Sequence, residues 1–242
     1  MSSNLSIVIP AYNEARFIGT LLERVLAVDL TELGLGKEVI VIDDGSKDDT
    51  AAIVRSYPVQ LLSKPNGGKG SAVREGIRRA TGDYLMIQDA DLEYDPNDYL
   101  PMMRALNAPG VDAVYGSRYM RSGESSGSWW ANVVRGRRPG QSWPAYLGGR
   151  SLSLVAWSCT GRLLSDTVTA LKLFRTPLIQ SLPLVTTGFE LDHEITARLL
   201  ARGKRIEEVS ISYFPRSKAE GKKIGLRDWW IGSKTFLRFR KG

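Results

Sequence analysis

The chain has 242 residues, of which 43% are apolar and 24% are charged, and this balance excludes a predominantly disordered protein. The single cysteine, Cys159, excludes an intramolecular disulfide, and with the lone His193 it also excludes a zinc site built from Cys and His. The net charge of +7 comes from residues 201–242, which hold twelve of the 33 Lys and Arg residues but four of the 26 acidic ones. Such a segment either attracts an anionic partner or forms an ordinary solvated surface.

Short apolar runs alternate with segments of helical periodicity over the first 115 residues. The runs predict strands at 5–9, 38–42, 59–62, 84–87 and 111–115. The periodic segments predict helices at 14–28, 50–56 and 70–80. This alternation indicates βαβ units and an α/β fold with a mainly parallel sheet. Ligands bind at the carboxyl ends of strands in such a sheet, and polar clusters follow four of the predicted strands, at 12–14, 43–46, 89–95 and 116–118.

The second half of the chain begins with a change of composition. Residues 121–149 are rich in Gly, Ser, Arg and Trp, and we expect a long mobile loop there. The elements predicted after it are a helix at 152–164, a strand at 170–174, a helix at 189–201, a strand at 206–213 and a basic amphipathic helix at 228–239. We see no repeat or linker and expect a single domain over residues 1–242. We also expect no secretory signal and no membrane span, because no run of 18 apolar residues occurs.

Two carboxylates follow the predicted strand at 84–87. Asp89 and Asp91 flank Ala90, so the two acidic side chains lie two residues apart at a strand end. Oxygen ligands of this kind can hold one hard divalent cation and leave its other positions to water and a diphosphate. The same spacing also occurs in ordinary turns, where Asp is favoured.

A glycine-rich, basic turn precedes the predicted helix at 70–80. Residues 64–70 read KPNGGKG, which places Lys69 at the start of that helix. Glycine lets the backbone approach a ligand closely, and the N-terminus of a helix favours phosphate. The order of residues is not that of a Walker A loop, and a plain loop is the alternative interpretation.

The order of these motifs is more specific than any one of them. In the first half they are PAYNE at 10–14, VIDDGS at 41–46, NGGKG at 66–70, QDADL at 88–92 and GSRY at 116–119. Further motifs lie at 164–166, 172–175, 188–190, 213–216 and 220–224. With this series the chain resembles the family 2 inverting glycosyltransferases of GT-A fold. Within them it is similar to the polyprenyl-phosphate group, the dolichol-phosphate mannose or glucose synthases, over nearly the whole chain except 121–148.

The resemblance implies a nucleotide-sugar site in residues 1–119. The residues that it assigns to the nucleotide sugar are Pro10, Tyr12, Glu14, Asp44 or its neighbour Asp43, Lys69, Asp89 and Ala90. Asp89 and Asp91 are expected to hold Mg²⁺ or Mn²⁺ on the donor diphosphate. Glu93 stands where the mannose branch often has Gln, so the donor is GDP-mannose or a UDP-sugar.

The resemblance also implies an acceptor half at 151–242, joined through the loop at 120–150. Arg118 matches an arginine that approaches phosphate, and Asp91, Arg118 and Arg216 are the residues that we assign to catalysis. The residues assigned to the acceptor are Arg150, Ser153, Lys222 and Lys223. Asp166 is either structural or a sugar contact.

The nature of the acceptor decides whether a base is needed. A phosphate monoester has a second pKa near 6 and is already an anionic nucleophile at neutral pH. A hydroxyl acceptor, in a polysaccharide or natural product, needs a general base, and Asp192 or Glu194 is the candidate. Glu190 and His193 lie beside them, and we expect His193 to have a packing or surface role. A more remote alternative is a nucleic-acid-binding protein that uses the basic C-terminal residues.

Tryptophans accompany the basic residues in two segments. Trp229 and Trp230 open the predicted C-terminal helix, and Trp129, Trp130 and Trp143 lie in the predicted loop. Aromatic and basic residues together suit the interface of an anionic bilayer, and burial against the core is the alternative. We expect peripheral association with the cytoplasmic face of a membrane, no nucleic-acid partner, and room for a membrane-protein partner or a homo-oligomer.

Overall fold

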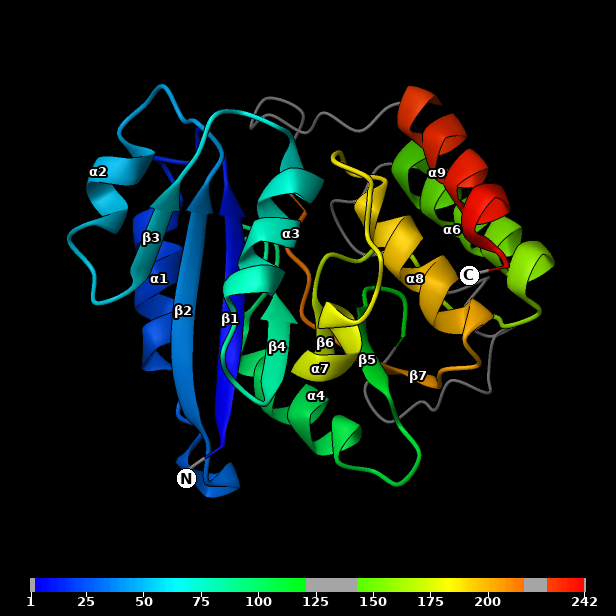
Figure 1. Ribbon diagram of the computed structural model, residues 1–242, viewed down its shortest axis with the longest axis horizontal. Helices are drawn as coiled ribbons and strands as arrows, with labels where there is room; N and C mark the ends of the chain where they lie inside the picture. The colour runs from blue at the N-terminus through cyan, green and yellow to red at the C-terminus, as the bar shows by residue number, and fades with distance from the viewer. Residues whose placement is uncertain (1–2, 121–142, 216–225, 242) are drawn as a thin grey trace.

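The computed structural model describes residues 3–120, 143–215 and 226–241. Within these ranges one sheet contains seven strands: β1 (Asn4–Ala11), β2 (Gly36–Asp43), β3 (Gln60–Ser63), β4 (Tyr84–Ile87), β5 (Ala113–Ser117), β6 (Lys172–Arg175) and β7 (Ile206–Ser210). Their order across the sheet is β3-β2-β1-β4-β6-β5-β7 (Figure 1). Neighbouring strands run parallel except β6, which is antiparallel to both β4 and β5. The predicted α/β fold with a mainly parallel sheet is confirmed.

Helices cover both faces of the sheet. One face carries α1 (Ile18–Ala27), α2 (Thr50–Val54) and α4 (Tyr99–Leu106), and the other carries α3 (Lys69–Arg79), α7 (Thr176–Gln180) and α8 (Leu191–Ala201). Short 3₁₀ turns lie at η1 (Thr31–Leu33) and η2 (Pro96–Asp98). Alternate side chains of β1 serve the two layers: Ile7 and Ile9 pack in the core with α1 and α4, and Val8 packs in the core with α3. Figure 1 shows α3 in front of the strands and α1 behind them.

Two further helices form an outer layer beside α8. They are α6 (Trp143–Thr160) and α9 (Leu226–Phe239), and Figure 1 shows them running next to α8 at the edge of the molecule. A separate apolar cluster joins the three helices, with Ala156 from α6, Ala197 from α8, and Phe236 and Phe239 from α9. In the part of the chain that the structure describes, no helix is long and apolar enough to cross a bilayer.

The predicted loop at 121–149 is wrong in its last part. α6 begins at Trp143, inside that segment, and ends at Thr160 instead of 164. Pro144 lies in the first turn of α6, where a proline removes no helical hydrogen bond. Gly149 allows the helix to approach Tyr119, because a Cβ there would come within 2.6 Å of the tyrosine hydroxyl. Residues 121–142 lie outside the described residues.

Other predicted elements are present with different ends. β5 lies at 113–117 instead of 111–115, and β7 ends at Ser210 instead of 213 because its partner β5 ends at Ser117. α1 begins at Ile18, after residues that turn away from β1. α4 and the short α7 were not predicted from the sequence; α4 is held by its buried face of Met102, Met103 and Leu106.

Candidate active site

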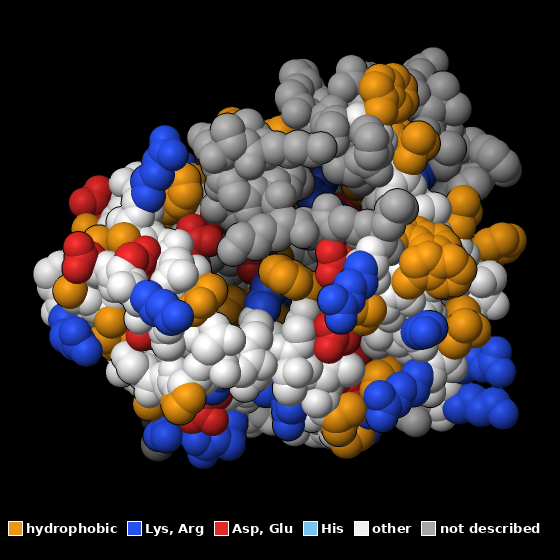
Figure 2. All heavy atoms as spheres, turned by 90° about the horizontal axis from the view of Figure 1, so that it is seen from above, with side chains coloured by type: hydrophobic (Ala, Val, Ile, Leu, Met, Phe, Trp, Pro, Cys, Tyr) orange, Lys and Arg blue, Asp and Glu red, His pale blue; other side chains and the backbone are white. Residues whose placement is uncertain are grey.

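The carboxyl ends of β1, β2 and β4 meet at one edge of the sheet. β1 has β2 on one side and β4 on the other, and all three run in the same direction. The strand order reverses at β1, with β2 and β3 on one side of it and β4 on the other. Open α/β sheets bind their ligands at such a point. Figure 2 looks onto this edge, where acidic and basic side chains lie close to apolar ones. The polar clusters predicted after β1, β2 and β4 are therefore brought together.

The segment after β1 is fastened to the start of α2. Pro10 is a buried residue of β1, and the Glu14 N–H donates to Thr50 Oγ1 over 2.8 Å. Asn13 has a φ of 55°, in the left-handed region that Asn tolerates better than most residues. Tyr12, just before this turn, is 38% exposed. The predicted nucleoside-binding segment thus presents an aromatic ring at the ligand-binding edge.

Asp44 holds the glycine-rich turn in place. Its carboxylate accepts the N–H of Gly67 over 3.0 Å and the N–H of Gly68 over 2.8 Å, and it forms an ion pair with Lys64. The Asp43 carboxylate accepts the N–H of Ser46, in the turn that follows β2, over 3.0 Å. Both aspartates are buried. The geometry therefore gives Asp44 a role in fixing the turn, and the contact of Asp44 or Asp43 with the nucleoside stays a prediction.

Lys69 is the first residue of α3 and reaches across the site. Its backbone is set by Gly68, whose φ of 91° and close approach to Thr187 both exclude a side chain there. The Lys69 Nζ lies 2.7 Å from Asp89 Oδ1 and 3.5 Å from Asp192 Oδ2. Burial acts to lower the pKa of Lys69, but the two carboxylates outweigh it and raise the pKa above its usual value.

The two carboxylates predicted to hold a metal ion lie at the end of β4. Asp91 is buried and its Oδ1 accepts the N–H of Glu93 over 3.0 Å, while Ala90 between them is also buried. Across the residues with described positions, no group of three or more His, Cys, Asp or Glu side chains could enclose a metal ion. Two carboxylates with space for water and phosphate are the donor set that Mg²⁺ takes beside a nucleotide, so Asp89 and Asp91 fit this role.

A buried lysine stands behind this group, and sequence reasoning missed it. Lys172 is fully buried at the start of β6, paired in register with Ile87 of β4 and Tyr115 of β5. Its ammonium lies 2.8 Å from Asp192 Oδ1. Burial lowers the pKa of Lys172, and Asp192 opposes this effect. The pKa of Asp192 is itself lowered, because Lys172 and Lys69 outweigh the effect of burial. A lysine inside the apolar run at 170–174 was the signal in the sequence.

Arg118 and Asp166 form a buried bidentate ion pair. The Arg118 Nε lies 2.6 Å from Asp166 Oδ2, and Nη2 lies 2.7 Å from Oδ1. The guanidinium also lies over the ring of Tyr213, 5.3 Å from its centroid. Arg118 follows β5, so the predicted residue is at the expected strand end. Asp166, left open between two roles by the sequence, orients this arginine.

The predicted acceptor residues Arg150 and Ser153 of α6 converge on the segment that carries Asp166. Arg150 Nη1 donates to the Ser165 carbonyl over 2.9 Å, and Ser153 Oγ lies 3.5 Å from the same oxygen. Beneath them, Glu208 accepts the N–H of Ser165 over 2.7 Å and that of Asp166 over 2.8 Å. Burial raises the pKa of Glu208 to about 7. Arg216, Lys222 and Lys223 lie outside the described residues.

Of the two candidate bases, Asp192 and Glu194, and their neighbours Glu190 and His193 at the start of α8, three have other partners or are enclosed. Glu194 is fully buried, accepts two hydrogen bonds from Thr186 and lies 2.8 Å from Arg198. His193 is buried between α8 and α9, where burial lowers its pKa to about 4. The Glu190 carboxylate accepts the N–H of Gly188, in the preceding loop, over 3.1 Å. Asp192 is the one of the four whose carboxylate faces Lys69 and the strand ends.

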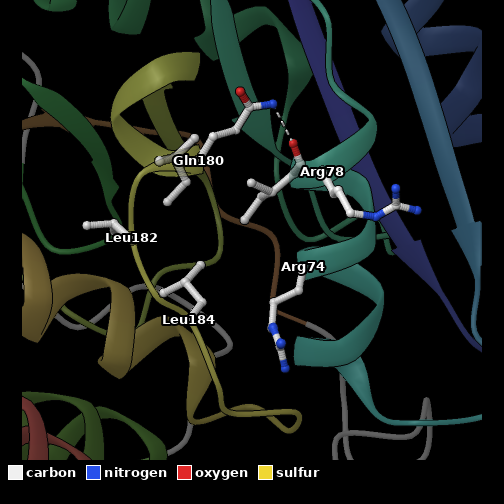
Figure 3. Close-up of a pocket in the computed structure, with 7 residues that line it drawn as sticks. Arg74, Arg78, Gln180, Leu182 and Leu184 are labelled. Atoms are coloured by element: carbon white, nitrogen blue, oxygen red, sulfur yellow. Dashed lines mark hydrogen bonds between the residues drawn. The ribbon is translucent and has the colours of Figure 1, made fainter.

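A pocket of about 310 Å³ lies away from this edge, between α3, α7 and the segment after α7 (Figure 3). Figure 3 shows Leu182 and Leu184 across the pocket from α3, with Arg74 on α3 and the Arg78 side chain extending away from the leucines. Gln180 donates to the backbone oxygens of Ile77 and Ala80, which joins α7 to the end of α3. No residue of the predicted site lines this pocket.

Comparison with known proteins finds a matching family model and similar curated proteins. The family model described as glycosyl transferase family 2 matches residues 6–165. A dolichol-phosphate mannosyltransferase of Pyrococcus furiosus is 28% identical over 235 residues, which is 91% of this chain and 59% of that protein. An undecaprenyl-phosphate 4-deoxy-4-formamido-L-arabinose transferase of Sodalis glossinidius is 29% identical over 185 residues, 74% of this chain and 51% of that protein. The chain thus spans between half and three fifths of these relatives.

Solved structures share the fold. The glucosyl-3-phosphoglycerate synthase of Mycobacterium tuberculosis, in complex with UDP, superposes with a TM-score of 0.69 at 20% identity, covering 98% of this chain and 80% of that one. The mannosyl-3-phosphoglycerate synthase of Rubrobacter xylanophilus gives a TM-score of 0.70 at 21% identity, covering 98% and 73%. Structures of the mycobacterial enzyme also contain Mn²⁺ with UDP.

Proposed function

The chain belongs to glycosyl transferase family 2, and from that membership we propose that it transfers a hexose from a nucleotide sugar to a polyprenyl phosphate. The donor is GDP-mannose or a UDP-sugar, and Mg²⁺ or Mn²⁺ assists the departure of the nucleotide. This proposal replaces the nucleic-acid interpretation of the basic C-terminal residues.

The donor lies across the carboxyl ends of β1, β2 and β4. Tyr12, Glu14 and Asp43 contact the nucleoside, and Asp44 keeps the glycine-rich turn in place beside it. Asp89 and Asp91 would hold the divalent cation, which would supply positive charge to neutralise the departing diphosphate. The chain itself supplies the ammonium of Lys69, which lies 2.7 Å from Asp89 Oδ1 at this edge and is within reach of a diphosphate bound there.

The pairing of Asp192 with two lysines is the observation that carries the choice of acceptor. A general base must accept a proton, but Lys172 and Lys69 lower the pKa of Asp192 and so weaken it as a base. Glu194 is enclosed and already bonded. A phosphate acceptor needs no base, and two arginines, Arg118 and Arg150, converge on the Ser165–Asp166 segment of the acceptor half. The names of the relatives, a dolichol-phosphate and an undecaprenyl-phosphate transferase, agree with this choice.

Peripheral contact with a bilayer is part of the proposal. One face of α6 carries four exposed apolar side chains: Trp143, Leu147, Leu154 and Trp157. One face of the adjacent α9 carries two more, Trp230 and Leu237. Exposed basic residues flank them: Arg227, Lys234 and Arg238 on α9, and Lys241 just after it. Amphipathic helices with aromatic and basic residues lie in the interface of anionic membranes.

A comparison of two acceptors tests the proposal. Polyprenyl phosphate and polyprenol of the same chain length are offered with labelled GDP- and UDP-sugars and Mn²⁺. The proposal expects label to pass to the phosphate and not to the alcohol. Transfer to the alcohol or to a soluble hydroxyl compound, with none to the phosphate, would support the alternative in which Asp192 is the base.

A further inference from the structure

Four charged side chains of alternating sign form a row from the predicted metal site into the protein. Asp89 contacts Lys69 at 2.7 Å, Lys69 contacts Asp192 at 3.5 Å, and Asp192 contacts Lys172 at 2.8 Å. The row is electrically balanced: two carboxylates and two ammonium groups. Asp91, two residues from Asp89, adds a further carboxylate beside this row.

A divalent cation bound to Asp89 would compete with the Lys69 ammonium for the same carboxylate oxygen. Asp89 Oδ1 has the ammonium in direct contact, so a divalent ion touching that oxygen would meet a positive charge at short range. Asp192 does not depend on Lys69 for neutralisation, because Lys172 contacts its other oxygen. Lys69 can therefore leave this row without exposing an unpaired buried carboxylate at Asp192.

The backbone around Lys69 is fixed at the N-terminus of α3. Gly70 packs so closely that a Cβ there would come within 2.7 Å of the Gly188 oxygen, and the Ser71 N–H donates to Thr187 O over 3.0 Å. These contacts anchor the N-terminus of α3, which itself favours an anion. A diphosphate placed at this helix end would offer oxygens to the same ammonium.

We propose that Lys69 makes divalent-cation binding at Asp89 depend on the donor diphosphate. Without nucleotide, the ammonium neutralises Asp89 and repels a bare cation. With nucleotide, the ammonium moves to the phosphate oxygens and leaves the carboxylate to the cation. This inference rests on the proposed function, since it takes the donor to be a nucleoside diphosphate. Binding of cation and nucleotide is then cooperative, and by linkage each strengthens the other by the same factor.

Binding of Mn²⁺ to the purified chain tests the proposal without an activity assay. Free Mn²⁺ is measured by electron paramagnetic resonance, with no nucleotide, with UDP and with GDP. We expect Lys69→Met to bind bare Mn²⁺ about tenfold more tightly than wild type. A positive charge beside a carboxylate lowers its affinity for a proton by about that factor or more, and we expect an effect of at least this size on its affinity for a cation. The enhancement of Mn²⁺ affinity by nucleotide should fall by a similar factor in the variant.

Two control variants separate the position of the charge from its presence. Lys69→Arg keeps the positive charge and should bind bare Mn²⁺ as wild type does. Arg78→Met removes one exposed positive charge from the same helix, far from Asp89, and should leave both affinities unchanged. Thermal unfolding of each variant verifies that it is folded.

The outcomes distinguish this inference from the proposed function. Equal affinity of wild type and Lys69→Met for bare Mn²⁺, with nucleotide still enhancing both equally, would overturn the role of Lys69 and leave the donor site standing. An absence of Mn²⁺ binding even with UDP or GDP would overturn both. A tenfold change that Arg78→Met reproduces would show a general charge effect and also overturn the inference.

Discussion

Replacement of Asp192 by asparagine removes the carboxylate partner of a fully buried ammonium. Lys172 has no exposed surface, and the Asp192 oxygen at 2.8 Å is its charged partner. Breaking a buried ion pair by removing one member costs about 3–5 kcal/mol, because the remaining charge is left uncompensated. For a chain of this length that corresponds to a fall in Tm of about 10 °C. We therefore expect Asp192→Asn to be strongly destabilised, whatever its effect on activity.

Urea unfolding of a double-mutant cycle measures this effect. The second substitution, Lys172→Met, removes the ammonium and should restore at least half of the stability lost in Asp192→Asn. The deficit of the single variant should also shrink as pH rises from 7 to 10. Without Asp192, burial keeps the pKa of Lys172 low in the folded state, so the unfolded state binds more protons and stability increases with pH. A deficit below 1 kcal/mol, or no recovery with Lys172→Met, would refute the importance of this pair.

Three further predictions concern other parts of the molecule. Asp91→Asn should lower transfer by about 100-fold or more while far-UV circular dichroism stays unchanged, since it removes a charge at the site and not in the core; full activity would disprove its assignment to the metal ion. Glu208 disfavours its charged form in the folded state, so the stability of wild type relative to Glu208→Gln should fall by about 3 kcal/mol between pH 4.5 and 8, measured by urea unfolding; a difference independent of pH would contradict the raised pKa. The double variant Trp230→Ser, Leu237→Ser should bind anionic liposomes more weakly in flotation assays. Its Tm should not change, since both side chains are exposed. Unchanged flotation would argue against membrane contact through α9.

The strand ends of the first half could be predicted because their signal is local. Apolar runs followed by polar clusters place Tyr12, Asp43 and Asp89 at one edge once the sheet is parallel. The partners within that edge could not be predicted. The hydrogen bonds from the glycine-rich turn to Asp44 join residues far apart in the sequence, and no periodicity records them.

The second half of the chain was harder to predict, because its sequence patterns do not reveal strand direction or the partners of buried charges. β6 inserts antiparallel between β4 and β5, and an apolar run gives no sign of strand direction. Lys172 within that run is tolerated because Asp192 of α8 neutralises it, a contact that the sequence does not show. The sequence assigned Arg118 to catalysis and gave no sign that it also stabilises the fold, although Arg118→Ala would leave Asp166 buried without its charged partner.

Transfer of labelled sugar to polyprenyl phosphate is the measurement that tests the proposed function most directly. Wild-type protein is incubated with GDP- and UDP-sugars in turn, with Mn²⁺ or with EDTA, and the label in the lipid phase is counted. We predict labelled lipid from one class of donor, dependent on the metal ion. Absence of labelled lipid with every donor, or equal labelling in EDTA, would contradict the proposal.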